Sequence, residues 1–135
     1  MTFGSTYSLE RWLDEVDDLA LAATAAPAGQ EAAYVQAMTI LMRLRPAVGG
    51  APGLCPRRER ELSGYVDAGA CAQAALGLVP ERSCVMTSRA DAGYHCASVR
   101  LDGQGSEATS VGNSFALALV GALALSFVEK GVPVL

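Results

Sequence analysis

Hydrophobic residues recur every three or four positions in two segments near the start of the chain. Residues 8–25 read SLERWLDEVDDLALAATA, and residues 30–45 read QEAAYVQAMTILMRLR. This spacing places the apolar side chains on one side of a helix, so both segments are predicted to be amphipathic helices. Ser8 can cap the first helix, the APAG turn at 26–29 separates the two, and Pro46 ends the second. We expect a helical hairpin.

Two further helices are predicted beyond a segment without periodicity. Residues 46–57, PAVGGAPGLCPR, are rich in proline and glycine and indicate a linker or a long surface loop. The third helix fits about 60–78 and ends before Pro80. The fourth, Ser114–Lys130, has Ser114 as its expected N-cap. It is apolar on all sides and therefore needs burial by a sheet, other helices or another subunit. Its uncharged run is shorter than the roughly 20 residues that a bilayer requires, so no membrane contact is expected.

Between these two helices, residues 84–101 alternate polar and apolar positions around a tight turn: CVMTSRADAGYHCASVRL. Alternation predicts two antiparallel strands. With the turn centred on Asp91 and Ala92, the pairs are Cys84 with Val99, Met86 with Ala97, and Ser88 with His95. Because an isolated two-stranded ribbon is marginal in water, a further strand near Glu107 to Val111, or a partner subunit, should cover it.

This register predicts two different faces for the hairpin. The apolar face would carry Cys84, Met86, Ala97, Val99 and Leu101; the other would carry Val85, Thr87, Arg89, Tyr94, Cys96, Ser98 and Arg100. On that second face two arginines and a tyrosine are suited to holding an anion and stacking a ring. The candidate ligand-binding residues are therefore Arg89, Tyr94 and Arg100, with the hydroxyls of Ser106 and Thr109 in the stretch that follows. A solvent-exposed face or a dimer contact is the alternative interpretation.

The length of the chain and its charge limit the kinds of protein that it can be. A chain of 135 residues is expected to form one domain of α+β class. Its parts would be a helical hairpin at 1–45, a linker at 46–57, and a helix, strand, strand, helix unit with an antiparallel β-hairpin at 58–135. The net charge of -4 resides entirely before residue 27, and such an acidic end is no nucleic-acid surface. No signal peptide opens the chain, so a cytoplasmic location is expected.

No pattern of catalytic or metal-binding residues is found. The cysteines Cys55, Cys71, Cys84 and Cys96 are far apart without a CxxC pair, and Cys84 and Cys96 are predicted to point to opposite faces. His95 is the only histidine and has no partner suggested by a motif. Arg57, Arg58 and Arg60 alternate with glutamates and read as a solvated helix start. We therefore expect neither an enzyme nor a cofactor or metal.

Two short segments resemble small phage and prophage proteins with an alpha-beta-alpha sandwich domain. In that family a segment similar to DAALTLVP precedes the hairpin and one similar to ATPALALCAAAL follows it. The matching residues are Ala74, Ala75, Leu76, Leu78, Val79 and Pro80 in the first, and Ala116, Leu117, Ala118 and Leu119 in the second. Gln73 and Phe115 replace the usual Asp and Pro of the family. The resemblance covers about half of the chain, from about residue 60 to 130.

The resemblance implies a function without catalysis. Some small phage proteins of comparable architecture are counter-defence factors that sequester cyclic nucleotide signals in pockets between subunits. By this analogy the chain would be a phage or prophage accessory protein, a homo-oligomer that binds a small anionic, nucleotide-like ligand or a host protein. The alternative is a structural or morphogenetic phage component that uses the same faces as protein interfaces.

Overall fold

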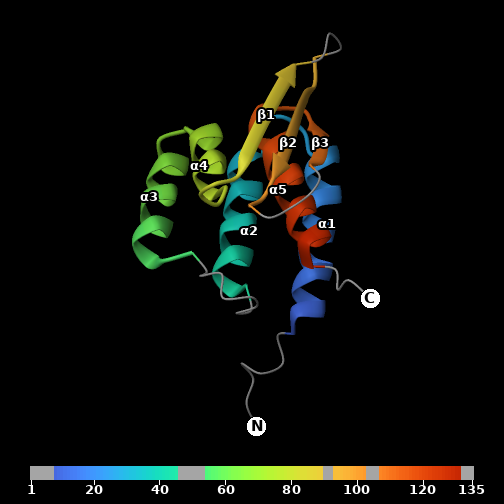
Figure 1. Cartoon of the computed structure of the whole chain (residues 1–135). Helices are drawn as coiled ribbons and strands as arrows, with labels where there is room; N and C mark the ends of the chain where they lie inside the picture. The colour runs from blue at the N-terminus through green and yellow to red at the C-terminus, as the bar shows by residue number, and fades with distance from the viewer. Residues whose placement is uncertain (1–7, 46–53, 90–92, 103–106, 132–135) are drawn as a thin grey trace.

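The computed structural model of the chain describes residues 8–45, 54–89, 93–102 and 107–131. It is an α+β fold of helices and one antiparallel sheet, which confirms the predicted class (Figure 1). The helices are α1 (Leu9–Ala25), α2 (Glu31–Leu44), α3 (Pro56–Asp67), α4 (Cys71–Leu78) and α5 (Phe115–Gly131). The strands are β1 (Cys84–Arg89), β2 (His95–Arg100) and β3 (Ala108–Gly112).

The predicted helical hairpin is confirmed by α1 and α2. The Ser8 hydroxyl accepts a hydrogen bond from the Arg11 amide at 3.1 Å, which satisfies a free N–H group at the start of α1. The Trp12 indole N–H donates to the Leu41 carbonyl oxygen at 2.7 Å. This bond joins the two helices, because Trp12 is buried in α1 and Leu41 belongs to α2.

The predicted single helix at about 60–78 is wrong, because two helices occupy that part of the chain. Helix α3 ends at Asp67 and α4 begins at Cys71. Between them Gly69 adopts a φ of 80°, a left-handed conformation that ends helices and that favours glycine. The Ala70 amide bonds the Tyr65 carbonyl oxygen at 2.8 Å, which closes the end of α3. The chain can therefore turn back and lay α4 against α3.

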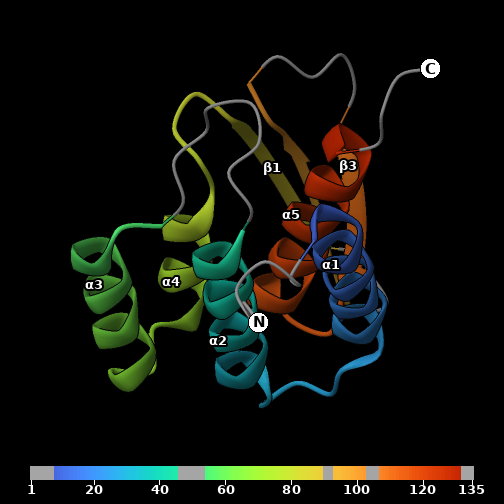
Figure 2. The ribbon, with the colours of Figure 1, turned by 90° about the horizontal axis from the view of Figure 1, so that it is seen from below.

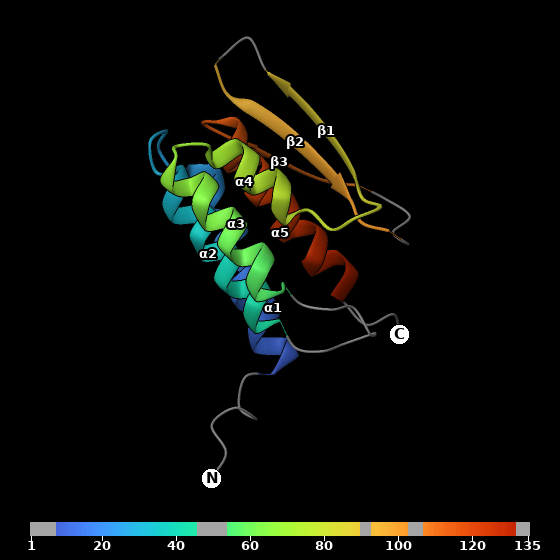
Figure 3. The same ribbon diagram turned by 90° about the vertical axis from the view of Figure 1, so that its left-hand side faces the viewer.

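The strands form a sheet in the order β1-β2-β3, with both neighbouring pairs antiparallel. Strand β3 confirms the further strand expected near residues 107–111. Helix α5 packs against β2 and β3, and α1 packs against α5 and reaches β3. Helices α2, α3 and α4 make no extensive contact with the strands. All the described helices lie on the same side of the sheet (Figures 2 and 3). No second helical layer covers the other face within the described residues.

Helix α5 is the centre of the hydrophobic core, as its all-apolar sequence requires. Leu117, Leu119, Val120 and Leu123 have at most 1% of their surface exposed, although they point to different sides of the helix. The sheet covers one side of α5, and α1, α2 and α4 cover the others. The Ser114 side chain accepts from the Leu117 amide at 3.3 Å and caps the helix as predicted.

The predicted register of the hairpin is wrong by one residue. Val85 pairs with Val99, and Arg89 pairs with His95. The connection between the latter two contains an odd number of residues and includes Gly93, whose φ is 91°. Since side chains alternate between faces, the shift moves every residue of β1 to the opposite face from the one expected. For β2 the predicted faces are confirmed, because Ala97 and Val99 are buried against the helices.

Two glycines allow the sheet and helices to approach closely. A Cβ atom at Gly112 in β3 would lie 2.7 Å from the backbone nitrogen of Ala118 in α5. A Cβ atom at Gly121 in α5 would lie 2.5 Å from the hydroxyl of Ser110 in β3. At the same corner the Asn113 side-chain amide donates to the Ala26 carbonyl oxygen at 2.7 Å, which ties the β3–α5 turn to the end of α1.

We expect Gly112→Ala to lower the free energy of unfolding by about 1–3 kcal/mol, because its methyl group would press on α5 backbone that cannot rotate away. Gly64→Ala is the matched control: it lies in α3 with nothing within 4 Å of a new Cβ atom. That change should be neutral or stabilising by up to about 1 kcal/mol. Urea denaturation measures both, and equal stabilities of the two variants would contradict the close-packing argument.

Candidate functional site

The sheet face turned away from the helices, here called the outer face, is uncovered in the part of the chain that the structure describes. Its residues are Cys84, Met86 and Ser88 of β1, Cys96, Ser98 and Arg100 of β2, and Thr109 and Val111 of β3. Met86 is 65% exposed and Val111 39%. These two apolar side chains lie on the two outer strands, with β2 between them, and their exposure marks the outer face as a candidate interaction surface.

Polar side chains occupy the middle and one end of the outer face. The hydroxyls of Ser98 and Thr109 lie opposite each other on β2 and β3 and are hydrogen-bonded at 2.8 Å. The Arg100 guanidinium donates to the Cys84 sulfur at 3.5 Å, across the β1–β2 pair. This contact with Cys84 raises the pKa of Arg100 above its ordinary value, so the guanidinium stays charged at any physiological pH. The outer face thus combines apolar, hydroxyl and cationic groups.

The structure does not bring the predicted ligand-binding residues together in one site. Arg100 and Thr109 lie on the outer face, whereas Arg89 belongs to the opposite face and to the other end of β1. The two arginines are therefore separated by the thickness of the sheet and by five residues along a strand, or about 17 Å. Tyr94 is 43% exposed in the segment just before β2. Ser106 lies outside the described residues.

The register also corrects the expectation for the cysteines. Cys84 and Cys96 point to the same face, not to opposite faces, because Cys96 pairs with Ser88. They are four residues apart along the ribbon, about 13 Å at the rise of a strand, which is too far for a disulfide. All four cysteines are free thiols.

The exposure of Met86 and Val111 was not predicted from the sequence. Met86 was expected on the covered face together with Ala97, because both strands have an apolar residue at alternate positions. The signal that could have corrected this is the odd number of residues with a glycine in the turn, which shifts a hairpin register. Val111 could not be assigned to a face, since the predicted strand near it had no partner register.

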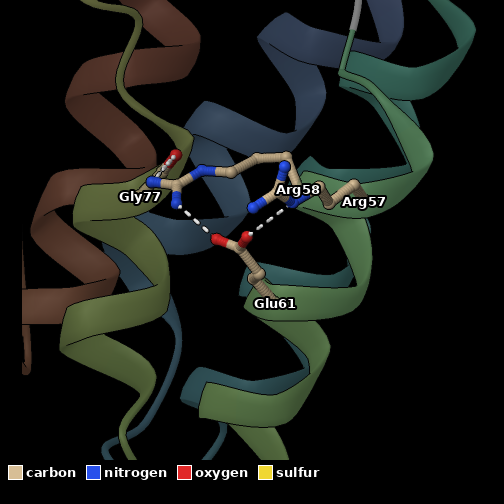
Figure 4. A network of polar contacts seen from close by, with 4 residues as sticks. All are labelled: Arg57, Arg58, Glu61 and Gly77. Carbon is tan, nitrogen blue, oxygen red and sulfur yellow. Dashed lines mark hydrogen bonds and ion pairs between the residues drawn. The ribbon is translucent and has the colours of Figure 1, made fainter.

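A groove of about 890 Å³ lies on the helical side of the molecule, between the ends of α2, α3 and α4. Figure 4 shows the network at its wall, where Glu61 accepts from Arg58 at 3.0 Å and contacts Arg57 at 3.6 Å. The second terminal nitrogen of Arg58 donates to the Gly77 carbonyl oxygen at 3.2 Å. Arg58 therefore links α3 to α4. The arginine-rich segment does lie at the start of a helix, as predicted, but Arg58 is more than a solvated side chain because it bonds α4.

Arg45 lies at another wall of the same groove and is partly buried. Its guanidinium is stacked over the rings of Trp12 and Phe127, with centroids at 5.8 and 5.0 Å. Burial lowers the pKa of Arg45 from its ordinary value, but an arginine remains charged. Stacking on the rings stabilises the cation at the edge of the hydrophobic core, where Trp12 and Phe127 lie.

The charges of the groove balance. Among the described residues that line it are three arginines, Arg45, Arg57 and Arg58, and three carboxylates, Glu61, Glu81 and Asp102. Two of these arginines already contact Glu61. A neutral groove does not favour an anion over water, so its position and size alone assign it no ligand class. The outer face is the stronger candidate site.

The network in Figure 4 predicts different effects for two neighbouring arginines. Arg58→Lys should lower the free energy of unfolding by about 0.5–1.5 kcal/mol. The planar guanidinium of arginine bonds Glu61 and the Gly77 carbonyl through two separate nitrogens, whereas lysine has a single ammonium nitrogen that cannot reach both. Arg57→Lys is the control and should change it by less than about 0.5 kcal/mol, since Arg57 is 86% exposed. Thermal or urea unfolding measures both variants. Equal losses would argue against the link between α3 and α4.

The register makes a second prediction about the two hairpin arginines. If an anionic ligand binds the outer face, Arg100→Gln should remove the rise in melting temperature that the ligand causes, and Arg89→Gln should retain it. The measurement is a thermal-shift screen against linear and cyclic nucleotides. Loss of the shift in both single variants would contradict the separation of the two side chains.

No group of three or more histidine, cysteine or acidic residues suited to a metal ion is found among the described residues. Within the same residues no helix combines the length and hydrophobicity needed to span a bilayer. Comparison of the chain with family models, with curated proteins and with solved structures finds no match.

Proposed function

We propose that this protein is a non-enzymatic binding protein whose outer face contacts a partner protein. The observation that carries the proposal is the uncovered face on which the exposed Met86 lies beside Ser98 of the Ser98–Thr109 hydroxyl pair and the exposed Val111 lies beside Cys96. Such a mixture of exposed apolar groups and hydrogen-bonding groups is typical of protein interfaces.

The shape of the outer face supports a protein rather than a small ligand. Small molecules bind in concave sites that bury most of their surface, whereas protein partners cover broad, gently curved surfaces. A three-stranded sheet face offers no enclosing walls, and the 890 Å³ groove is lined by residues of the helical side instead. The separation of Arg89 from Arg100 removes the paired charge on which the sequestration of an anionic ligand would depend.

The side chains of the outer face indicate which groups a partner protein should present to it. An apolar patch on the partner would cover Met86 and Val111, and a carboxylate would face Arg100, which is the one charged side chain among the outer-face residues defined above. In the phage or prophage setting that the sequence resemblance suggests, this partner is a host protein, and counter-defence is the role. In the morphogenetic alternative the same face would bind another phage protein.

The proposal predicts that Val111→Glu abolishes partner binding, because it places a carboxylate in the apolar part of the outer face beside β2. Leu21→Glu is the matched control, since Leu21 is 66% exposed on α1, away from the outer face. The measurement is affinity purification of the tagged chain from its natural cells after cross-linking, with quantitative mass spectrometry of the bound protein and of the cross-linked residues.

We expect one partner at a fixed ratio to wild type, retained by Leu21→Glu and lost by Val111→Glu, with cross-links near the sheet. Circular dichroism checks that both variants fold. Retention of the partner by Val111→Glu, or cross-links confined to the helices, would refute the outer face as the binding surface. A rise in melting temperature with a nucleotide that depends on Arg100 would instead support the small-ligand interpretation.

A further inference from the structure

Strand β1 is an open edge of the sheet. Its only hydrogen-bonded neighbour is β2, so its other side presents backbone N–H and C=O groups without a strand partner among the described residues. Five of its six residues are exposed, and only Val85 is partly buried. Proteins usually protect such an edge with a proline, a lysine, a bulge or a covering helix. β1 contains neither proline nor lysine, its one charged residue, Arg89, stands at the last position of the strand, and its pairing with β2 runs without interruption.

The helices do not protect this edge either. Helix α5 packs against β2 and β3 but no described helix packs extensively against β1 (Figures 1 and 3). At the opposite edge of the sheet, α1 reaches β3. The helical layer thus reaches one edge of the sheet and stops short of the other. A strand can be added beside β1 without displacing a helix.

We propose that β1 pairs with β1 of a second copy, in antiparallel orientation about a two-fold axis, to form a continuous six-stranded sheet. A second copy is favoured by the distribution of charge. Five acidic residues lie on α1, namely Glu10, Asp14, Glu15, Asp17 and Asp18, and α1 is the helix on the β3 side. Pairing through β1 keeps the two acidic helices at the far ends of the joined sheet, whereas pairing through β3 would bring them together.

The register of this pairing follows from the faces of the strand. Paired residues must point to the same face, so the two-fold axis passes through a residue and not between two. An axis at Met86 pairs this side chain with its counterpart, Val85 with Thr87 of the other copy, and Cys84 with Ser88. It covers the most exposed large apolar residue of the sheet. It also keeps Arg89 away from its counterpart, so no like charges are opposed.

The size of the contact sets the strength of the dimer. One strand edge buries less than the roughly 1,200–2,000 Å² of a stable interface. We therefore expect monomers and dimers in exchange at micromolar to millimolar concentration, not a permanent dimer. Backbone hydrogen bonds supply the attraction, and the Met86 contact at the axis selects the register.

The experiment measures the mass of the full chain by sedimentation velocity over about a hundredfold range of concentration. Wild type should shift from monomer toward dimer. Met86→Lys places two like charges at the axis and should stay monomeric, because the ammonium groups repel and the apolar contact is lost. Circular dichroism checks that its secondary structure is unchanged, as expected for a residue that is 65% exposed.

A cross-linking variant tests the geometry independently. Met86→Cys should form an intermolecular disulfide under mild oxidation, because Cα atoms paired across strands are about 4.5–5.5 Å apart, within the range of disulfides. Val111→Cys is the control, also exposed on the outer face but in β3. A monomer at every concentration for wild type, or equal cross-linking of the two cysteine variants, would overturn the proposal. Dimers that persist in Met86→Lys would place the contact elsewhere.

Discussion

Helix α5 must be buried, because a helix that is apolar on every side cannot face water on any of them. The sheet covers it on one side, and α1, α2 and α4 cover it on the others. Most of the helices and strands in the described residues therefore serve to enclose this one helix.

The enclosure depends on small residues as much as on large ones. Gly112 and Gly121 stand where the sheet and α5 are too close for another carbon atom, and Ala20 of α1 lies at the same contact. Close approach brings more atoms within dispersion range, which compensates for the few aromatic residues of the core. The same approach fixes β2 and β3 on the helical layer, while β1 lies beyond it.

This asymmetry connects the fold to the proposed binding surfaces. Helices α1, α2 and α4 pack on α5 and α3 packs on α2 and α4, so in the described part of the chain no helix covers the outer face. The outer face and the β1 edge are adjacent parts of one exposed region, and Met86 belongs to both. Pairing of two copies at β1 would join their outer faces into one wider surface. The two proposals remain separate, since Val111 tests the face and Met86 tests the edge.

Much of the local structure could be read from the sequence, because it depends on neighbours in the chain. The spacing of apolar residues located α1, α2 and α5, and Ser8 and Ser114 were recognisable as caps. The break at Gly69 was missed, although glycine is the residue that most often ends a helix in the left-handed conformation. One helix was predicted instead, because residues after Gly69 share one side of a continued helix; these are Ala70, Cys71, Ala74, Ala75 and Leu78.

Hydrophobic periodicity in the sequence is enough to predict the class of the fold and the buried helix. Which face each residue of β1 occupies, and hence the separation of Arg89 from Arg100, follows only from the packed sheet. Periodicity carries this limit because it reports which positions are buried. In β2 the buried positions Ala97 and Val99 mark the face turned toward the helices, whereas in β1 only Val85 is partly buried and the other residues are exposed. One partly buried position is too weak a pattern to fix the register of a strand.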